Sequence, residues 1–414
     1  MPRTNRIFYG WIVVAVTTLV LLTSAGVRSA PGVFLLPVQA SMHWERATLA
    51  FAASLGLLLY GLAGPFSGWL MSRFNLRWIT VVGLVLISTS MIASLWISEP
   101  WHLTLIWGVF SGIGTGMIGS VLSAAIAARW FIAHRGLVVG IFGAAISAGQ
   151  LIFVPLLMRF NGTIGWRNGS LILGLIAGMV IVPVALLLRD DPSELGLRPL
   201  GASETQPIGR SKAETGVMGR ALRSPAFWLL SATFFVCGAT SNGLIGTHLI
   251  PYAIECGIPE VAAASSLAIL GAMNFLGTMA SGWLTDRYDP RRLLLIFYCF
   301  RGISLLCLPF ARDPLTLSLF AAVFGLDYIA TVPPTTALIA DIFGRRNVGI
   351  VYGWVFCAHQ LGAALAAWLG GIARDQLGNY TLAFIVAGII ALLAGTTALM
   401  IKRTSTVPAP VSAL

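Results

Sequence analysis

Charged residues are scarce in this sequence of 414 residues. Only 10% of the residues are Asp, Glu, Lys or Arg, 57% are hydrophobic, and the mean hydropathy is +0.86. An ordinary soluble domain carries about 25% charged residues. Long polar stretches are also scarce, and the main one covers residues 189–224. This composition excludes an ordinary soluble globular protein.

The motifs of common enzyme classes are missing as well. The sequence has no Walker sequence, no H-E-x-x-H and no G-x-S-x-G. The glycine-rich run 108–116 follows no predicted strand, so it indicates close helix packing rather than a nucleotide-binding loop. The five cysteines are odd in number and lack metal-ligand spacing, which argues against a disulfide framework. We therefore expect no enzymatic activity, no cofactor and no metal site.

Apolar runs of about 20 residues, the length that crosses a bilayer as a helix, recur along the chain. A β-barrel would instead show alternating segments of about 10 residues, and none is visible. The pattern predicts an all-α membrane protein with twelve transmembrane helices. They are expected at residues 8–36, 46–71, 77–97, 101–128, 136–158, 168–188, 225–253, 261–285, 293–310, 314–340, 348–373 and 380–401.

The net charge of +11 follows the predicted topology. Basic residues gather in alternate loops, for example at Arg73, Arg77, Arg287 and Arg291. This asymmetry is expected of cytoplasmic loops, so the positive charge requires no nucleic-acid partner. We predict a multi-pass protein of the cell (inner) membrane with both termini in the cytoplasm.

The chain also repeats itself. At an offset of 214 (282 minus 68), residues 68–70 and 282–284 both read GWL, and at an offset of 213 (349 minus 136) three glycines recur. Parallel repeats of six helices are typical of secondary transporters, whose site lies between the halves. The prediction is an N-terminal six-helix bundle at 1–188, a cytoplasmic linker at 189–224, a C-terminal six-helix bundle at 225–402 and a cytoplasmic tail at 403–414.

One string adds a family resemblance. Residues 282–292, GWLTDRYDPRR, resemble the signature G-x-L-x-D-R-x-G-R-R of the major facilitator superfamily. The first-half copy, GWLMSRFNLRW, has Ser72 in place of the Asp. The resemblance implies the major facilitator fold of two pseudo-symmetric six-helix halves. It also implies that Asp286 and Arg287 form a gating signature, in which Asp286 pairs with bases across the cytoplasmic side.

Within that superfamily the sequence looks most like the monocarboxylate transporters and the oxalate:formate antiporters. The likeness rests on residues 9–14 (YGWIVV), 129–150 (RWFIAHRGLVVGIFGAAISAGQ) and 352–366 (YGWVFCAHQLGAALA). It implies a small organic anion as the substrate. The sequence departs from those relatives just before the signature, where 277–282 reads GTMASG and lacks their substrate-binding arginine.

Arg28, Arg301 and Asp327 are the charges that we place inside the bilayer, and they sum to +1. A cavity with excess positive charge suits an anion. Arg28 can hold a carboxylate through two parallel hydrogen bonds, unless it extends to the outer interface. Gly26 and Pro31 flank it, so a bent or locally unwound helix is expected there. Its repeat counterpart, Asn242, either supplies a neutral donor from the facing half or bonds between helices.

Opposite charges on neighbouring helices, Arg301 and Asp327, are expected to pair. The pair is either locked or switchable. In a switchable pair, protonation of Asp327 would free an arginine to hold the anion. His359 aligns with the lysine that binds oxalate in the antiporters, so it is a candidate for anion binding and proton sensing; hydrogen-bonded packing is the alternative. His248 is a weaker candidate.

These observations favour a monomeric secondary transporter that moves a small organic anion, most simply a monocarboxylate, by alternating access with proton symport. The substrate-binding candidates are Arg28, His359, Asn242 and Arg301, and the proton-coupling candidates are Asp327 and His359. The partners are the anion, protons and the lipid bilayer. An anion exchanger, a drug or metabolite exporter and, from another class, a non-transporting membrane sensor are the alternatives.

Overall fold

The computed structural model describes residues 8–203, 214 and 216–402, so the predicted tail at 403–414 lies outside the described residues. The first half contains α1 (Gly10–Met42), α2 (Arg46–Arg73), α3 (Leu76–Ala93), α4 (Pro100–Leu103), α5 (Gly112–Met117), α6 (Ser120–Trp130) and α7 (Arg135–Leu187). Short α8 (Val217–Leu222) precedes the second half. That half contains α9 (Pro225–Gly238), α10 (Gly246–Glu255), α11 (Glu260–Thr285), α12 (Pro290–Cys307), α13 (Pro314–Asp327), α14 (Val332–Phe343), α15 (Val348–Leu377) and α16 (Thr381–Ala398).

The predicted number of membrane-crossing helices is confirmed. Eleven helical stretches among the described residues are long and apolar enough to cross a membrane. The longest, α7, contains a non-helical backbone at Gly165 (φ 80°, ψ 162°), so it consists of two helices joined at a kink. Only glycine adopts this conformation readily. The predicted loop at 159–167 is therefore mostly helical.

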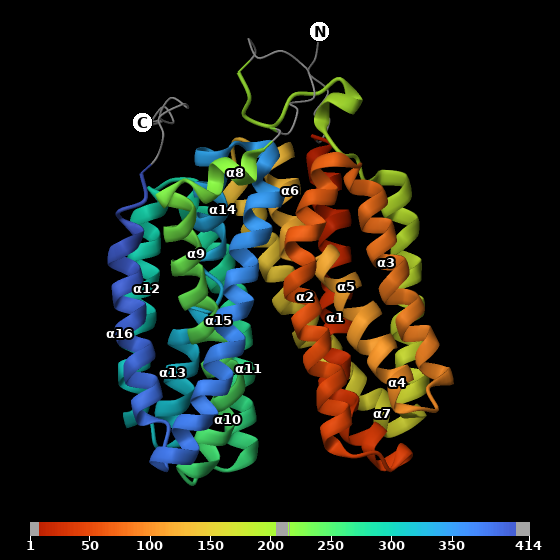
Figure 1. Cartoon of the computed structure of the whole chain (residues 1–414), viewed down its shortest axis with the longest axis vertical. Coiled ribbons are helices and arrows are strands. Elements are labelled where there is room, and N and C mark those ends of the chain that lie inside the picture. The colour runs from red at the N-terminus through yellow and green to blue at the C-terminus, as the bar shows by residue number, and fades with distance from the viewer. Residues whose placement is uncertain (1–7, 204–213, 215, 403–414) are drawn as a thin grey trace.

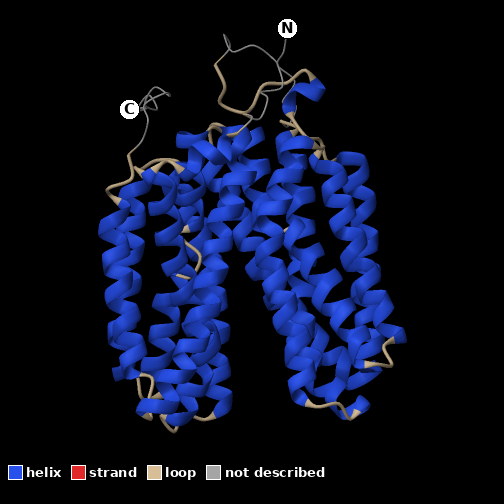
Figure 2. Cartoon of the chain, in the orientation of Figure 1, coloured by secondary structure: helices blue, strands red, loops and turns tan. Residues whose placement is uncertain are grey.

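Several crossing helices are interrupted where the sequence predicted continuous runs. A π-helical segment, Thr104–Ser111, joins α4 to α5, and a second, Ala239–Ile245, joins α9 to α10. A turn at residues 328–331 separates α13 from α14. Figure 2 shows that the rest of both halves is helical, with loops mainly at the two ends.

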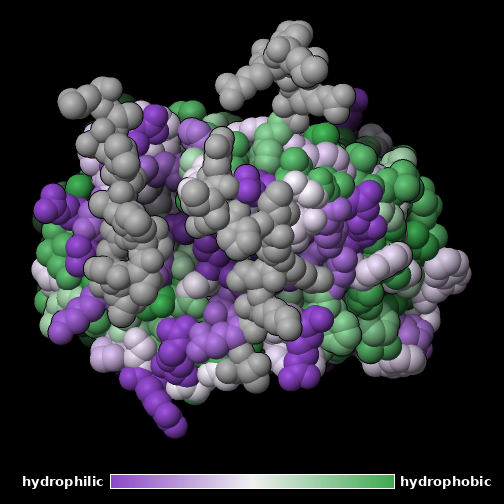
Figure 3. Space-filling model, turned by 90° about the horizontal axis from the view of Figure 1, so that it is seen from above, coloured by the Kyte–Doolittle hydropathy of each residue, from purple (hydrophilic) through white to green (hydrophobic). Residues whose placement is uncertain are grey.

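The helices form two bundles, with residues of the first half in red to yellow and those of the second in green to blue (Figure 1). The bundles lie close together near the linker and diverge toward the opposite end. We call the end that carries residues 189–203 and α8 the linker side, and the opposite end the far side. Hydrophilic side chains lie across the linker side, and hydrophobic ones lie mainly at its left and right margins (Figure 3).

Glycines allow α2 and α15 to touch between the halves. A methyl group on Gly353 would lie 2.6 Å from the Gly64 carbonyl oxygen, and a side chain on Gly68 would overlap the backbone of Gly349. Backbones can approach this closely only where both helices carry small residues. The α2–α15 contact therefore depends on glycine.

The second contact, between α7 and α11, has the same construction. A side chain on Gly136 would overlap the Gly282 carbonyl, and one on Gly282 would overlap the Gly136 carbonyl. Gly282 is the repeat of Gly68, and Gly349 is the repeat of Gly136. The two interfaces are thus related by the internal repeat, and together they hold the halves together on the linker side.

We predict that Gly353→Ala lowers the midpoint of thermal unfolding, because its methyl group forces backbone shifts that typically cost about 1–3 kcal/mol. Gly371→Ala is the matched control on the same helix, since nothing lies within 4 Å of a methyl group there. Thermal denaturation of both variants in detergent gives the comparison. Equal midpoints for Gly353→Ala and Gly371→Ala would show that the close contact between α2 and α15 does not contribute to thermal stability.

Candidate functional site

A buried ion cluster joins the halves on the linker side. Asp190 follows the end of α7, is fully buried, and pairs with Arg129 of the first half. Arg346, which precedes α15, bridges to Asp190 (3.1 Å) and to Asp191 (3.0 Å). The start of the linker therefore contributes the carboxylates that connect the two bundles. The polar composition of residues 189–224 did not predict that Asp190 would be buried.

The predicted gating signature follows the end of α11. Asp286 accepts hydrogen bonds from the backbone N–H groups of Gly136 (2.6 Å) and Leu137 (2.8 Å), at the start of α7. Burial raises the pKa of this carboxyl, although the two N–H donors and the charge of Arg135 act in the opposite direction. Its direct partners are thus backbone donors at a helix N-terminus rather than bases. Arg287 lies over the Trp283 ring, 3.9 Å from its centroid.

Arg28 lies on an uninterrupted helix. The expected local unwinding at this position is wrong, because α1 continues through Gly26 and Pro31. In lipid, backbone groups must be bonded within the protein, which favours a continuous helix across a proline. The guanidinium carbon lies 5.3 Å from the centroid of the Tyr60 ring on α2, and its charge acts on Tyr328 of the second half.

Arg28 is half-buried and makes no ion pair or hydrogen bond to any described residue. A guanidinium does not lose its charge, so its five N–H donors need partners from outside the described protein. Its position near groups of both halves identifies Arg28 as the centre of the candidate site.

The second half presents a tyrosine and an amide at interrupted helices. The Tyr328 hydroxyl, in the turn between α13 and α14, donates to the Asn242 Oδ1 atom (3.0 Å), which belongs to the π-helical segment between α9 and α10. Such segments are frequent at functional sites. The bond occupies the amide oxygen of Asn242 and leaves its N–H groups without a partner among the described residues. The proposed role of Asn242 as a neutral donor stays a prediction.

The predicted pairing of Arg301 with Asp327 is confirmed. The Arg301 Nε atom donates to Asp327 Oδ2 (2.6 Å), and both side chains are buried. The Nη2 group donates to the carbonyls of Asp327 (2.6 Å) and Tyr328 (3.1 Å). The Nη1 group donates to the Cys237 carbonyl (3.3 Å) and the Thr240 hydroxyl (3.2 Å).

Arg301 therefore satisfies backbone carbonyls at both interruptions of the second half. A π-helical segment and a helix break leave carbonyls without their usual partners, and lipid offers no replacement. Because these bonds occupy its donors, direct contact of Arg301 with a substrate stays a prediction that requires the pair to open. Asp327 Oδ1 has no hydrogen-bond partner among the described residues, although it is buried.

His359 is a buried residue of α15. Its ring lies between Phe234 (centroids 4.8 Å apart) and Phe356 (5.7 Å apart), and its Nδ1 atom is 2.9 Å from Gln360 Oε1. The Nδ1 atom therefore has a partner inside the second half, and the side chain of that partner, Gln360, contacts α2 of the first half. The substrate and proton roles of His359 stay predictions.

His248, the weaker candidate, takes part in packing. Its Nε2 atom lies 2.9 Å from the Ala367 carbonyl oxygen, and its ring contacts Tyr380 (centroids 5.1 Å apart). This is the environment of a histidine that packs between helices and bonds to a backbone carbonyl.

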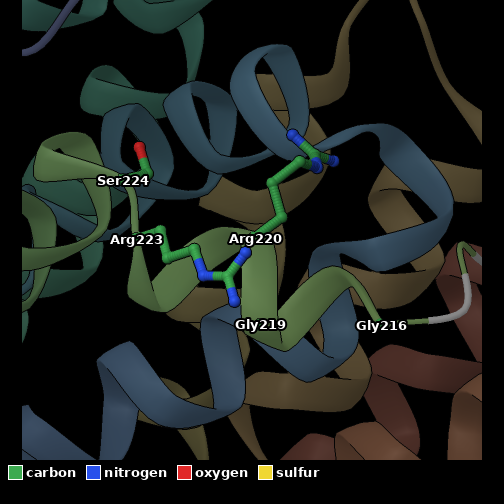
Figure 4. Close-up of a pocket in the computed structure, with 5 residues that line it drawn as sticks. All are labelled: Gly216, Gly219, Arg220, Arg223 and Ser224. Carbon is green, nitrogen blue, oxygen red and sulfur yellow. The ribbon is translucent and has the colours of Figure 1, made fainter.

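A pocket on the linker side lies apart from the candidate site. Its lining residues are Gly216, Gly219, Arg220, Arg223 and Ser224. Arg220 extends from α8 toward the neighbouring helix (Figure 4), where it lies 5.6 Å from the Phe343 ring centroid and pairs with Glu214 (2.6 Å). This pocket is formed by the linker and contains none of the predicted site residues.

Three residues of the site were missed from the sequence: Tyr60, Tyr328 and Gln360. Each is a polar residue within a long apolar run, and this pattern could have identified it as a candidate site residue. The position of Tyr60 and Tyr328 near Arg28, and of Gln360 against α2, depends on helix rotation and on the break after Asp327, which hydropathy does not predict.

Among the described residues, apolar membrane-crossing helices form two repeated bundles, which is the architecture of many secondary transporters. The chain belongs to the Major Facilitator Superfamily, whose family model matches residues 17–326 and 274–413. As expected for this family, the protein is a multi-pass membrane transporter and not an enzyme.

Relatives cover nearly the whole chain. The sequence is 28% identical to the MFS-type transporter YcxA of Bacillus subtilis (90% of both chains). It is 27% identical to Monocarboxylate transporter 13 of Rattus norvegicus (94% of this chain, 87% of the relative). These matches support the sequence-based resemblance to the monocarboxylate group.

Solved structures share the fold. The proton:xylose symporter XylE bound to 6-bromo-6-deoxy-D-glucose matches with a TM-score of 0.76, at 19% identity over 96% of both chains. The transporter FucP in the outward conformation matches with a TM-score of 0.72, at 18% identity over 96% of this chain and 100% of FucP.

We predict that Arg301→Leu and Asp327→Leu each lower the free energy of unfolding by about 3–5 kcal/mol, because each leaves one buried charge without its partner. The double variant should lose much less than the sum of the two, since no unpaired charge is left. Chemical denaturation in detergent measures all three. Additive losses in the double variant would refute the energetic coupling of the pair.

Proposed function

We propose that this protein transports a small organic anion with a single carboxylate. The observation that carries the proposal is Arg28, a permanent cation between the halves with no ion pair to a described residue. An arginine binds a carboxylate through two parallel hydrogen bonds, which gives geometric specificity as well as energy. Its position over Tyr60 leaves the guanidinium edge available for such a bond.

The balance of charge supports a monoanion. Arg301 is neutralised by Asp327 at 2.6 Å, so it adds no net charge to the site. Arg28 alone then provides one positive charge, and the nearby groups Tyr328, Asn242 and Gln360 are neutral. A dianion would enter with one charge uncompensated in a region of low dielectric. Similarity to Monocarboxylate transporter 13 and Monocarboxylate transporter 12 agrees with this class of substrate.

The transport cycle that we propose is alternating access between halves 1–188 and 225–402, connected by the linker 189–224. The linker side faces the cytoplasm of a cell whose inner membrane holds the protein, because alternate loops there carry most of the basic residues. The proposed location of both termini is the cytoplasm as well. Contacts on the linker side and divergence on the far side then correspond to an outward-facing state. We propose that a monomer completes this cycle.

Proton symport is the proposed coupling, with Asp327 as the main proton acceptor and His359 as a second candidate. Asp327 is buried, and its Oδ1 atom lacks a partner among the described residues. If Arg301 leaves the pair, the buried carboxylate favours its protonated form, because burial penalises the charged one. Anion exchange is the main rival, since it needs the same cation but no proton.

We predict that Arg28→Gln abolishes saturable uptake of labelled propionate into proteoliposomes, because the bidentate cation is lost. Arg28→Lys should not restore uptake, since an ammonium group lacks the planar pair of donors. Arg159→Gln, at an exposed arginine of α7, is the matched control and should transport like wild type. Wild-type uptake by Arg28→Gln would place the anchor elsewhere.

We also predict that Asp327→Asn keeps exchange of labelled for unlabelled propionate but loses uphill accumulation driven by a pH gradient. The amide can still accept the Arg301 bond but cannot carry the transported proton. Asp375→Asn, an exposed acid on α15, is the control. Accumulation by both Asp327→Asn and His359→Gln under a pH gradient alone would replace symport with facilitated transport or anion exchange.

A further inference from the structure

Gln360 lies at the boundary between the halves. A methyl group on Gly61 would lie 2.9 Å from its Cβ atom and 3.2 Å from its Cγ atom, so the side chain passes directly over α2. The adjacent Tyr60 lies below the Arg28 cation, and Phe356, one turn before Gln360, has its ring 5.7 Å from that tyrosine. Arg28 and Gln360 therefore approach the same segment of α2 from opposite halves.

His359 fixes the orientation of the Gln360 amide. The Nδ1 atom of His359 lies 2.9 Å from Gln360 Oε1, and an amide oxygen only accepts, so Nδ1 must carry the hydrogen. The rings of Phe234 and Phe356 hold the His359 ring from either side, so the direction of this N–H bond is fixed.

His359 is 7% exposed, whereas Gln360 is half-buried. Because Oε1 is occupied, the amide nitrogen is directed away from His359, and it has no partner among the described residues. We propose that Gln360 is the hydrogen-bond donor with which the second half binds the substrate, and that His359 positions it.

The proposal names the substrate class more closely and rests on the proposed function. A cation on one half and a neutral N–H donor on the other match a monocarboxylate with a second, uncharged oxygen, either a hydroxyl or a keto group. A second carboxylate would find no second free cation, because Arg301 is bound by Asp327. In this proposal the neutral amide of Gln360 makes the site selective for such acids over dicarboxylates.

The test compares three probes in proteoliposomes: propionate, L-lactate and malonate. Wild type should bind lactate more tightly than propionate. In Gln360→Ala the ratio of lactate to propionate affinity should fall roughly 3- to 10-fold, the value of one neutral hydrogen bond. Gln360→Lys should raise malonate affinity relative to lactate, because it adds a second cation. Gln376→Ala, at an exposed glutamine of the same helix, should leave all three affinities unchanged.

The positioning role of His359 has its own readout. His359→Phe keeps an aromatic ring between Phe234 and Phe356 but removes the N–H donor. It should lower the same affinity ratio as Gln360→Ala, through the apparent KM rather than the maximal rate. The double variant should lose no more than the larger single loss, since both changes remove one interaction.

The outcomes distinguish a failure of the roles of Gln360 and His359 from a failure of the proposed transport function. An unchanged lactate-to-propionate ratio in Gln360→Ala, or no gain of malonate in Gln360→Lys, overturns the role of Gln360 while uptake that depends on Arg28 continues. Full additivity with His359→Phe overturns the positioning role. If wild type takes up none of the three probes, or Arg28→Gln transports propionate normally, the proposed function fails and this inference fails with it.

Discussion

The bond between Arg301 and Asp327 sets the shape of the second half. A guanidinium keeps its charge at any physiological pH, so one that is fully buried in a membrane protein needs a counter-ion and bonded N–H groups. Asp327 supplies the charge, and carbonyls at two helix interruptions accept most of the remaining bonds. Lipid offers no hydrogen bonds to either group. The N–H groups of Arg301 therefore depend on these carbonyls as acceptors, and the carbonyls depend on Arg301 as their donor.

The two halves differ in the charge that they place inside the membrane. In the second half the interruptions turn Tyr328 and Asn242 toward each other, and the buried charges of Arg301 and Asp327 beside them cancel. In the first half α1 is continuous and carries Arg28 without a counter-ion among the described residues. In the site that we propose, Arg28 is the fixed cation among the described residues, and the groups near it are neutral hydrogen-bonding ones. We propose that this combination favours an anion over the amphipathic cations of a drug exporter.

Hydropathy predicted the crossing helices because lipid forces an apolar segment of this length to be helical. The pairing of Arg301 with Asp327 was predictable because each charge alone is too costly in the membrane. Other features depended on tertiary contacts. The break after Asp327 is stabilised by Arg301 from another helix, and the buried Asp190 carboxylate is compensated by Arg129 and Arg346 from distant parts of the chain. Pro31 suggested an interruption that α1 does not contain.

The central claim is that a single fixed cation, Arg28, selects the charge of the substrate. The most direct measurement is competition for labelled lactate uptake in proteoliposomes by lactate and by lactamide, which has nearly the same shape but no charge. With Arg28 as the anchor, lactate should compete and lactamide should not, because an amide offers the guanidinium no anionic pair of oxygens. Equal competition by lactamide would contradict anion selection and the role assigned to Arg28.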